Sequence, residues 1–163
     1  MFWVVFGVFL CMVIAVGLGA LFGPPYVPTL RLNMVSALDL LALQKGQTLL
    51  DLGSGDGRIL LAAAERGWNA VGIEVSPILV IVSRVRTWKY RKQVRIIWGN
   101  YFFTKWPPAD AIFSFMIQYQ MKRLDERIEQ WHTKPIRFAS FAFQIPDKTP
   151  IAHSGAIYLY EYK

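Results

Sequence analysis

Hydrophobic and polar positions follow one another in blocks that predict a membrane span and, after it, an α/β domain. Residues 2–22 are apolar and carry no charge. At 1.5 Å rise per residue, a helix of this length can cross a hydrocarbon core of about 30 Å. From residue 31 onwards, short apolar runs alternate with segments whose apolar residues recur at helical spacing. This alternation is typical of an open, mostly parallel sheet with right-handed crossovers.

The pattern predicts about six strands and four helices after the apolar run. The predicted strands are at 48–52, 69–75, 94–98, 109–116, 138–145 and 156–162. The predicted helices are at 31–44, 58–66, 77–92 and 119–131. Prolines between residues 23 and 28 form a stiff, non-helical collar between the apolar run and the body.

Charge and composition suggest how the chain is oriented. The chain has 18 Lys and Arg against 11 Asp and Glu, and every basic residue follows the apolar run, beginning with Arg31. Under the positive-inside rule we expect a single-pass membrane protein whose body lies on the cytoplasmic side. A cleaved signal peptide is the alternative, but no basic residue precedes the run. The lone Cys11 excludes an internal disulfide, and no Cys/His spacing suggests a metal site.

A glycine-rich turn carries the clearest chemical signal. Residues 49–58, Leu-Leu-Asp-Leu-Gly-Ser-Gly-Asp-Gly-Arg, leave the first predicted strand and open the next helix. Glycines let a ligand approach the backbone closely, and open α/β sheets bind nucleotides at the carboxyl ends of strands. The dinucleotide fingerprint would need glycine where Arg58 stands, and no phosphate-loop Gly-Lys-Ser/Thr follows. Glu74 closes the second strand nineteen residues after Gly55, where its carboxylate can accept bonds from a ribose diol. An ordinary surface glutamate is the alternative.

Residues 51–57 resemble the first motif of class I S-adenosylmethionine-dependent methyltransferases. Further segments resemble a narrower family, the small membrane-anchored lysine N-methyltransferases that act on the c subunit of ATP synthase, with their prokaryotic relatives. The segments that carry this resemblance are Val27-Pro28-Thr29, Asp51 to Ile59, Ala62-Ala63-Ala64, Arg66-Gly67, Gly72 to Pro77, and Ser83-Arg84 with Arg86 and Trp88. The resemblance covers roughly residues 24–125, and past Phe113 it thins.

The resemblance implies a Rossmann-like sheet of about six or seven strands and methyl transfer from S-adenosylmethionine to a lysine of a membrane or membrane-adjacent protein. The chain then divides into an anchor at 1–23, a collar and helix at 24–46, and a methyltransferase domain at 47–163. The implied cofactor-binding residues are Asp51, Gly53, Ser54, Gly55, Asp56, Gly57, Glu74, Asn100, Tyr26 and Thr29. Asn100 would receive the adenine amino group, although the family looks acidic there and a turn asparagine is the alternative. Tyr26 and Thr29 would cover the methionine moiety.

Methyl transfer to an amine is a direct displacement, so positioning supplies much of the catalysis, about 7–11 kcal/mol in good intramolecular systems. A lysine with an ordinary pKa of about 10.4 must first lose a proton, which a desolvated site favours. Ser114, Gln118 and Tyr119 follow the fourth strand on the acceptor side and are weak catalytic candidates, so the proton acceptor stays unassigned. Asp110 lies at the opposite end of that strand and is not expected to take part.

Other functions and partners remain compatible with the sequence. A methyltransferase of this fold can act on a lipid or small hydrophobic acceptor, and a silent module can bind the cofactor at a membrane. Six basic residues and no acid lie between 84 and 95. They favour an anionic leaflet over nucleic acid, because residues 2–22 already bring the chain to a bilayer. A solvated helix face is the alternative.

Overall fold

The computed structural model of the chain describes residues 6–7 and 31–163. Its strands are β1 (Thr48–Leu52), β2 (Asn69–Glu74), β3 (Val94–Trp98), β4 (Ala111–Ser114), β5 (Ile136–Phe141), β6 (Ala152–Ser154) and β7 (Ile157–Tyr162). Its helices are α2 (Arg31–Leu41), α3 (Arg58–Glu65), α4 (Pro77–Arg86) and α5 (Gln118–Trp131), and a 3-10 turn, η1 (Trp88–Tyr90), follows α4.

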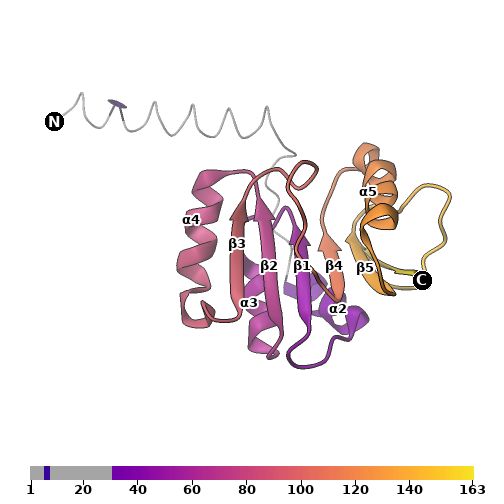
Figure 1. The fold of residues 1–163 in the computed structure, drawn as a ribbon, viewed down its shortest axis with the longest axis horizontal. Helices are drawn as coiled ribbons and strands as arrows, with labels where there is room; N and C mark the ends of the chain where they lie inside the picture. Colours follow the sequence, from indigo (N-terminus) through magenta and orange to yellow (C-terminus); the bar gives the residue numbers. More distant parts are fainter. Residues whose placement is uncertain (1–5, 8–30) are drawn as a thin grey trace.

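The seven strands form one mixed sheet in the order β3-β2-β1-β4-β5-β7-β6 (Figure 1). The five strands from β3 to β5 are parallel, while β7 pairs antiparallel with both β5 and β6. This order confirms the predicted Rossmann-like sheet and adds a terminal hairpin. Strand β6 was not predicted because three residues are too few to show a period-2 pattern.

Several predicted elements have different bounds in the structure, and helix α2, for example, ends at Leu41 instead of residue 44. Helix α4 ends at Arg86 instead of residue 92, because the chain tightens into η1. Strand β4 begins at Ala111 instead of residue 109, and the Asp110 carboxylate before it accepts the Thr48 N–H at 2.8 Å. Strand β5 ends before Ala142, whose φ of 71° is outside the strand region and excludes the predicted continuation to residue 145.

Two hydrophobic clusters cover the two faces of the sheet. Successive side chains of a strand point to opposite faces, so Leu49 packs with α2 and α3 while Leu50 and Leu52 pack with α5. Aromatic residues of the segment after β3, Phe102 and Trp106, complete the α5 side. Helix α4 lies beside α3 at the β3 edge of the sheet (Figure 1). This arrangement leaves the carboxyl ends of the central strands close to the turn that begins at residue 53.

The predicted membrane span at 2–22 lies outside the described residues, apart from residues 6 and 7. Among the residues that the structure does describe, none of the helices has both the length and the apolar character to span a bilayer.

Candidate functional site

The glycine-rich turn joins β1 to α3 at the carboxyl edge of the parallel strands. Gly53, Gly55 and Gly57 have φ values of 80°, 54° and 78°, which side chains with a Cβ rarely adopt. The N–H groups of Gly53 and Ser54 donate to the Ile73 carbonyl at 2.8 and 3.1 Å. The turn is therefore held to β2 through its backbone, and its three glycines present no side chains to a ligand.

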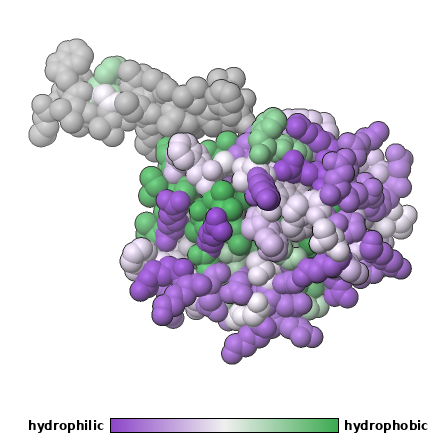
Figure 2. Space-filling view, in the orientation of Figure 1, coloured by the Kyte–Doolittle hydropathy of each residue, from purple (hydrophilic) through white to green (hydrophobic). Residues whose placement is uncertain are grey.

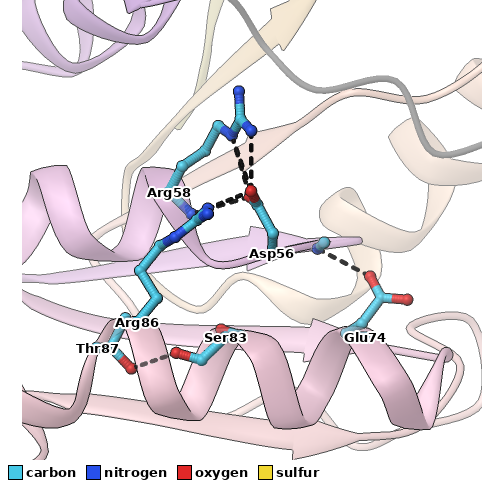
Figure 3. A network of polar contacts seen from close by, with 7 residues as sticks. Asp56, Arg58, Glu74, Ser83, Arg86 and Thr87 are labelled. Atoms are coloured by element: carbon cyan, nitrogen blue, oxygen red, sulfur yellow. Dashed lines mark hydrogen bonds and ion pairs between the residues drawn. The ribbon is translucent and has the colours of Figure 1, made fainter.

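The Glu74 carboxylate lies beside this turn. Glu74 ends β2 and is only 6% exposed. Its Oε2 accepts the Gly55 N–H at 2.9 Å (Figure 3), and its Oε1 accepts the Ser76 N–H at 2.8 Å. An ionised carboxylate offers about four acceptor positions, so two protein bonds leave room for two ligand hydroxyls. The side chain predicted to hold a ribose is thus oriented by the turn.

Asp51 adds a second buried carboxyl below the turn. Burial raises the pKa of the Asp51 carboxyl well above its usual range, and the negative charges of Glu74 and Asp56 raise it further. A cationic group brought close to Asp51 opposes this effect, because an opposite charge favours the ionised carboxylate. The site therefore favours a ligand that combines ribose hydroxyls with positive charge.

Asp56 is held by two arginines. Its carboxylate pairs with Arg58 at 2.8 Å and with Arg86 of α4, and both guanidinium groups point toward it in Figure 3. The side chain of Asp56 is 8% exposed, whereas those of Arg58 and Arg86 are about one third exposed. These pairs connect the turn to α3 and α4. The contact of Asp56 with a cofactor stays a prediction.

Two glycines allow close packing around the turn. A Cβ on Gly57 would lie 2.2 Å from Ser83 Oγ of α4, and a Cβ on Gly72 would lie 2.5 Å from Ser54 Oγ. Both serine hydroxyls are buried and, among the described residues, have no hydrogen-bond partner. The Ser54 side chain therefore packs toward β2, while its backbone remains in the turn.

The segment after β3 forms another wall of the site. Asn100 Oδ1 accepts the Phe102 N–H at 2.8 Å and so stabilises its own turn, which leaves one acceptor position for an amino group. Tyr101, which sequence reasoning missed, has a ring carbon 3.9 Å from where a Cβ on Gly53 would lie. Burial, with smaller contributions from the nearby Tyr119 and Glu74, raises the pKa of Tyr101 to about 12. No signal in the sequence distinguishes Tyr101 from its aromatic neighbours.

The three acceptor-side candidates are spread over different environments. The Ser114 hydroxyl is fully buried and donates to the Leu52 carbonyl at 3.3 Å, which ties β4 to β1. Gln118 is exposed and donates to the Gln144 carbonyl at 3.2 Å. Tyr119 is 76% exposed, and its hydroxyl accepts from Gln120, which itself accepts from Tyr101. Of these three candidates, only Tyr119 is thus linked through side-chain hydrogen bonds to Tyr101, which lies beside the glycine turn.

The remaining predicted positions lie elsewhere. Tyr26 and Thr29 are outside the described residues. Asp110 accepts from Lys134 at 2.5 Å at the amino end of β4, far from the turn, as predicted. A surface depression lined by Asp110 and Arg137 lies at that same edge and is separate from the candidate site.

Comparisons with known proteins place this chain among methyltransferases in sequence and in fold. A family model described as the ANTKMT methyltransferase domain matches residues 51–152. The lysine N-methyltransferase of the ATP synthase c subunit from Homo sapiens is 33% identical over 130 residues, covering 77% of this chain and 54% of that protein. A protein-lysine N-methyltransferase of Saccharolobus islandicus is 27% identical over 131 residues, covering 77% and 81%. The chain spans between 53% and 61% of the length of the animal relatives it matches.

Solved structures share the fold. An RNA methyltransferase from Salinibacter ruber, in complex with S-adenosyl-L-homocysteine, superposes with a TM-score of 0.78 and 25% identity, covering 83% of this chain and 93% of that one. A methyltransferase from Thiobacillus denitrificans, also with S-adenosyl-L-homocysteine, superposes with a TM-score of 0.56 at 19% identity, covering 76% of this chain and 54% of that one, which supports the fold alone.

Proposed function

The chain belongs to the ANTKMT methyltransferase domain family, and from this we propose that it transfers a methyl group from S-adenosylmethionine to a lysine amine of a membrane or membrane-adjacent protein. The single observation that supports this best is the contact between the glycine turn and the buried Glu74 carboxylate. Relatives named for lysines of the ATP synthase c subunit and of the adenine nucleotide translocase support a protein acceptor.

The residues around the turn fit this cofactor. Glu74 has acceptor positions for the two ribose hydroxyls, and the glycines at 53, 55 and 57 let a ligand lie against the backbone. Asp51 favours the positive charge of the methionine amino group and of the sulfonium. Either charge would lower the raised pKa of the buried Asp51 carboxyl and so stabilise its ionised form. Asn100 retains an acceptor position for the adenine amino group. When bound, S-adenosylmethionine supplies an activated methyl group on a positively charged sulfur.

On the acceptor side, the protein's part is to orient a lysine and to desolvate its amine. The exposed Gln118 and Tyr119 present polar atoms at the start of α5, beside the Gln120–Tyr101 pair. A desolvated amine has a lowered pKa and carries the lone pair needed to form the new N–C bond. The proton that the amine loses before transfer passes to water. Because the transfer itself is a direct displacement, the protein needs no covalent nucleophile.

We also propose that residues 2–22 anchor the chain in a bilayer with the body on the cytoplasmic side. The support is the uncharged run and the basic residues that follow it, in a chain with a net charge of +7.

Binding and transfer experiments test this function in two steps. Calorimetry of the full chain with S-adenosylmethionine and S-adenosylhomocysteine should show binding of both. Labelled-methyl transfer into membrane fractions, separated into protein and lipid, should then place the label in protein as methyl-lysine. Label in lipid alone would contradict the lysine acceptor, and binding without transfer would indicate a silent module. A chain that binds neither compound would contradict the whole assignment.

A further inference from the structure

Helix α4 carries apolar residues on its outward face as well as on its inward face. Val80, Ser83 and Thr87 face inward and are buried. The outward residues are Ile78, Ile81, Val82 and Val85, and beyond the helix Trp88; they are between 39% and 72% exposed. Their spacing of i, i+3, i+4 and i+7 places the four aliphatic residues in one stripe along the helix. Figure 2 shows the corresponding hydrophobic surface on the side of the molecule where Figure 1 places α4.

Basic residues accompany this stripe along the chain, on α4 and in the segment that follows it. The exposed basic residues nearby in the chain are Arg84, Lys89, Arg91, Lys92 and Arg95, and no acid lies between residues 77 and 95. The Arg91 guanidinium lies 5.2 Å from the Trp88 ring centre, so a charge and an apolar ring are presented together. Exposed apolar stripes of this kind mark interaction sites, and a basic margin selects a partner with negative charge.

An anionic membrane surface fits this combination best. A helix with an apolar stripe and flanking Lys and Arg lies in the interface of such a leaflet, with its side chains in the acyl boundary and its charges at the headgroups. RNA would match the charge, but bases stack on aromatic rings, and the outward residues are four aliphatic side chains and a single aromatic one, Trp88. A second copy would bring its own net charge of +7 against the same basic margin.

We propose that α4 and η1 form a docking face that lies on an anionic leaflet, as a membrane contact separate from residues 2–22. This contact reaches the candidate site through Arg86, which leaves the last turn of α4 to pair with Asp56 of the glycine turn (Figure 3). Docking therefore fixes the orientation of the glycine turn relative to the bilayer. The proposal does not depend on methyl transfer, since it concerns lipid contact alone.

A depth measurement on the full chain tests the docking face. A nitroxide is attached at Val85→Cys in a Cys11→Ser background, and a matched label is attached at Lys122→Cys, exposed on α5 at the other end of the sheet. Both are reconstituted in phosphatidylcholine vesicles with and without phosphatidylglycerol. Collisions with oxygen, which concentrates in lipid, are compared with collisions with a water-soluble nickel chelate. With phosphatidylglycerol, the label at 85 should gain oxygen contact and lose nickel contact, while the label at 122 should not change.

A charge variant separates docking from anchoring. Replacing Lys89, Lys92 and Arg95 with Gln leaves the Arg86–Asp56 pair intact. Each basic residue near an anionic surface contributes about fivefold to the equilibrium constant for docking. Loss of three should therefore lower the ratio of docked to undocked α4 faces roughly a hundredfold. Circular dichroism checks that each variant is folded.

Three results would overturn the proposal. The label at 85 could stay as accessible to nickel as the label at 122. It could be shielded from both reagents, which would show that residues 2–22 or a second copy cover the face. It could also be shielded only when single-stranded RNA is added, which would show a nucleic-acid surface.

Discussion

The proposed cofactor side and the proposed acceptor side of the site are built in different ways. On the proposed cofactor side, Gly55 and Glu74 are 19 residues apart and are joined by a buried bond from backbone to carboxylate. On the acceptor side, Gln118 and Tyr119 are exposed on α5, and Gln118 bonds to a carbonyl 26 residues away. Backbone geometry in a buried turn admits one ligand shape, whereas exposed side chains can change without disturbing the core. We infer that the first region fixes the cofactor and the second selects the acceptor.

Removing the Glu74 carboxylate should have the largest effect. Glu74→Ala removes the proposed acceptor for two ribose hydroxyls and also leaves the Gly55 N–H without its partner. Bonds to a charged acceptor contribute about 1.5–3 kcal/mol each, so the dissociation constant of S-adenosylhomocysteine should rise roughly a thousandfold, or about 4 kcal/mol. Calorimetry measures this change.

The matched control for Glu74 is Glu65, an exposed acid at the end of α3. Glu65→Ala should bind S-adenosylhomocysteine as the parent does. Equal affinity of the Glu74→Ala variant and the parent would show that the turn does not hold a ribose.

The same contrast explains how much the sequence could predict. The glycine turn and Glu74 could be predicted from the sequence, because the glycine spacing requires a particular backbone shape and the acid ends the next strand. The pairing of Asp56 with Arg86 joins residues 30 positions apart through the packing of α4 on α3, which no local pattern encodes. Periodicity predicted α4 but did not show that its stripe from Ile78 to Val85 faces solvent, because an apolar stripe looks the same on either side of a helix.

A methyl group on Gly57 should damage the fold more than the cofactor affinity. Its φ of +78° costs an L-residue about 1–2 kcal/mol, and the new Cβ would meet Ser83 Oγ at 2.2 Å, which adds about 1–3 kcal/mol of overpacking. Gly57→Ala should therefore lower the free energy of unfolding by about 3 kcal/mol, measured with urea. Gly46→Ala is the control, since its φ is +85° with open space around it. Equal losses in the two variants would show that the contact between Gly57 and Ser83 is not tight.

The buried Asp51 carboxyl should lower the stability of the fold at neutral pH while it strengthens binding of S-adenosylmethionine. Because its pKa is raised in the folded state, the unfolded chain loses this proton first, and stability falls as pH rises from about 4 through the folded pKa. An asparagine at this position cannot ionise, so the Asp51→Asn variant does not lose stability in this way. Its free energy of unfolding in urea should exceed that of the parent at neutral pH, and the difference should vanish near pH 3. The variant should also bind S-adenosylmethionine more weakly. Asp39→Asn, on the surface of α2, serves as the control. An Asp51 variant less stable than the parent at neutral pH would contradict the buried-charge explanation.

The smallest effect is expected from Tyr119 on the proposed acceptor side. A larger effect would show that this side contains a catalytic group. The Tyr119 hydroxyl is exposed and accepts one long bond of 3.4 Å from Gln120. A hydrogen bond of this kind contributes about 0.5 kcal/mol, so Tyr119→Phe should change kcat/KM for the acceptor about threefold or less, with cofactor affinity unchanged. Tyr158→Phe, at a half-buried position on β7, provides the control for loss of a tyrosine hydroxyl. A loss of about a hundredfold, with a shifted pH profile, is the size expected of a general base. It would assign the lysine proton to Tyr119 and show that the acceptor side contains fixed chemistry as well as a selective surface.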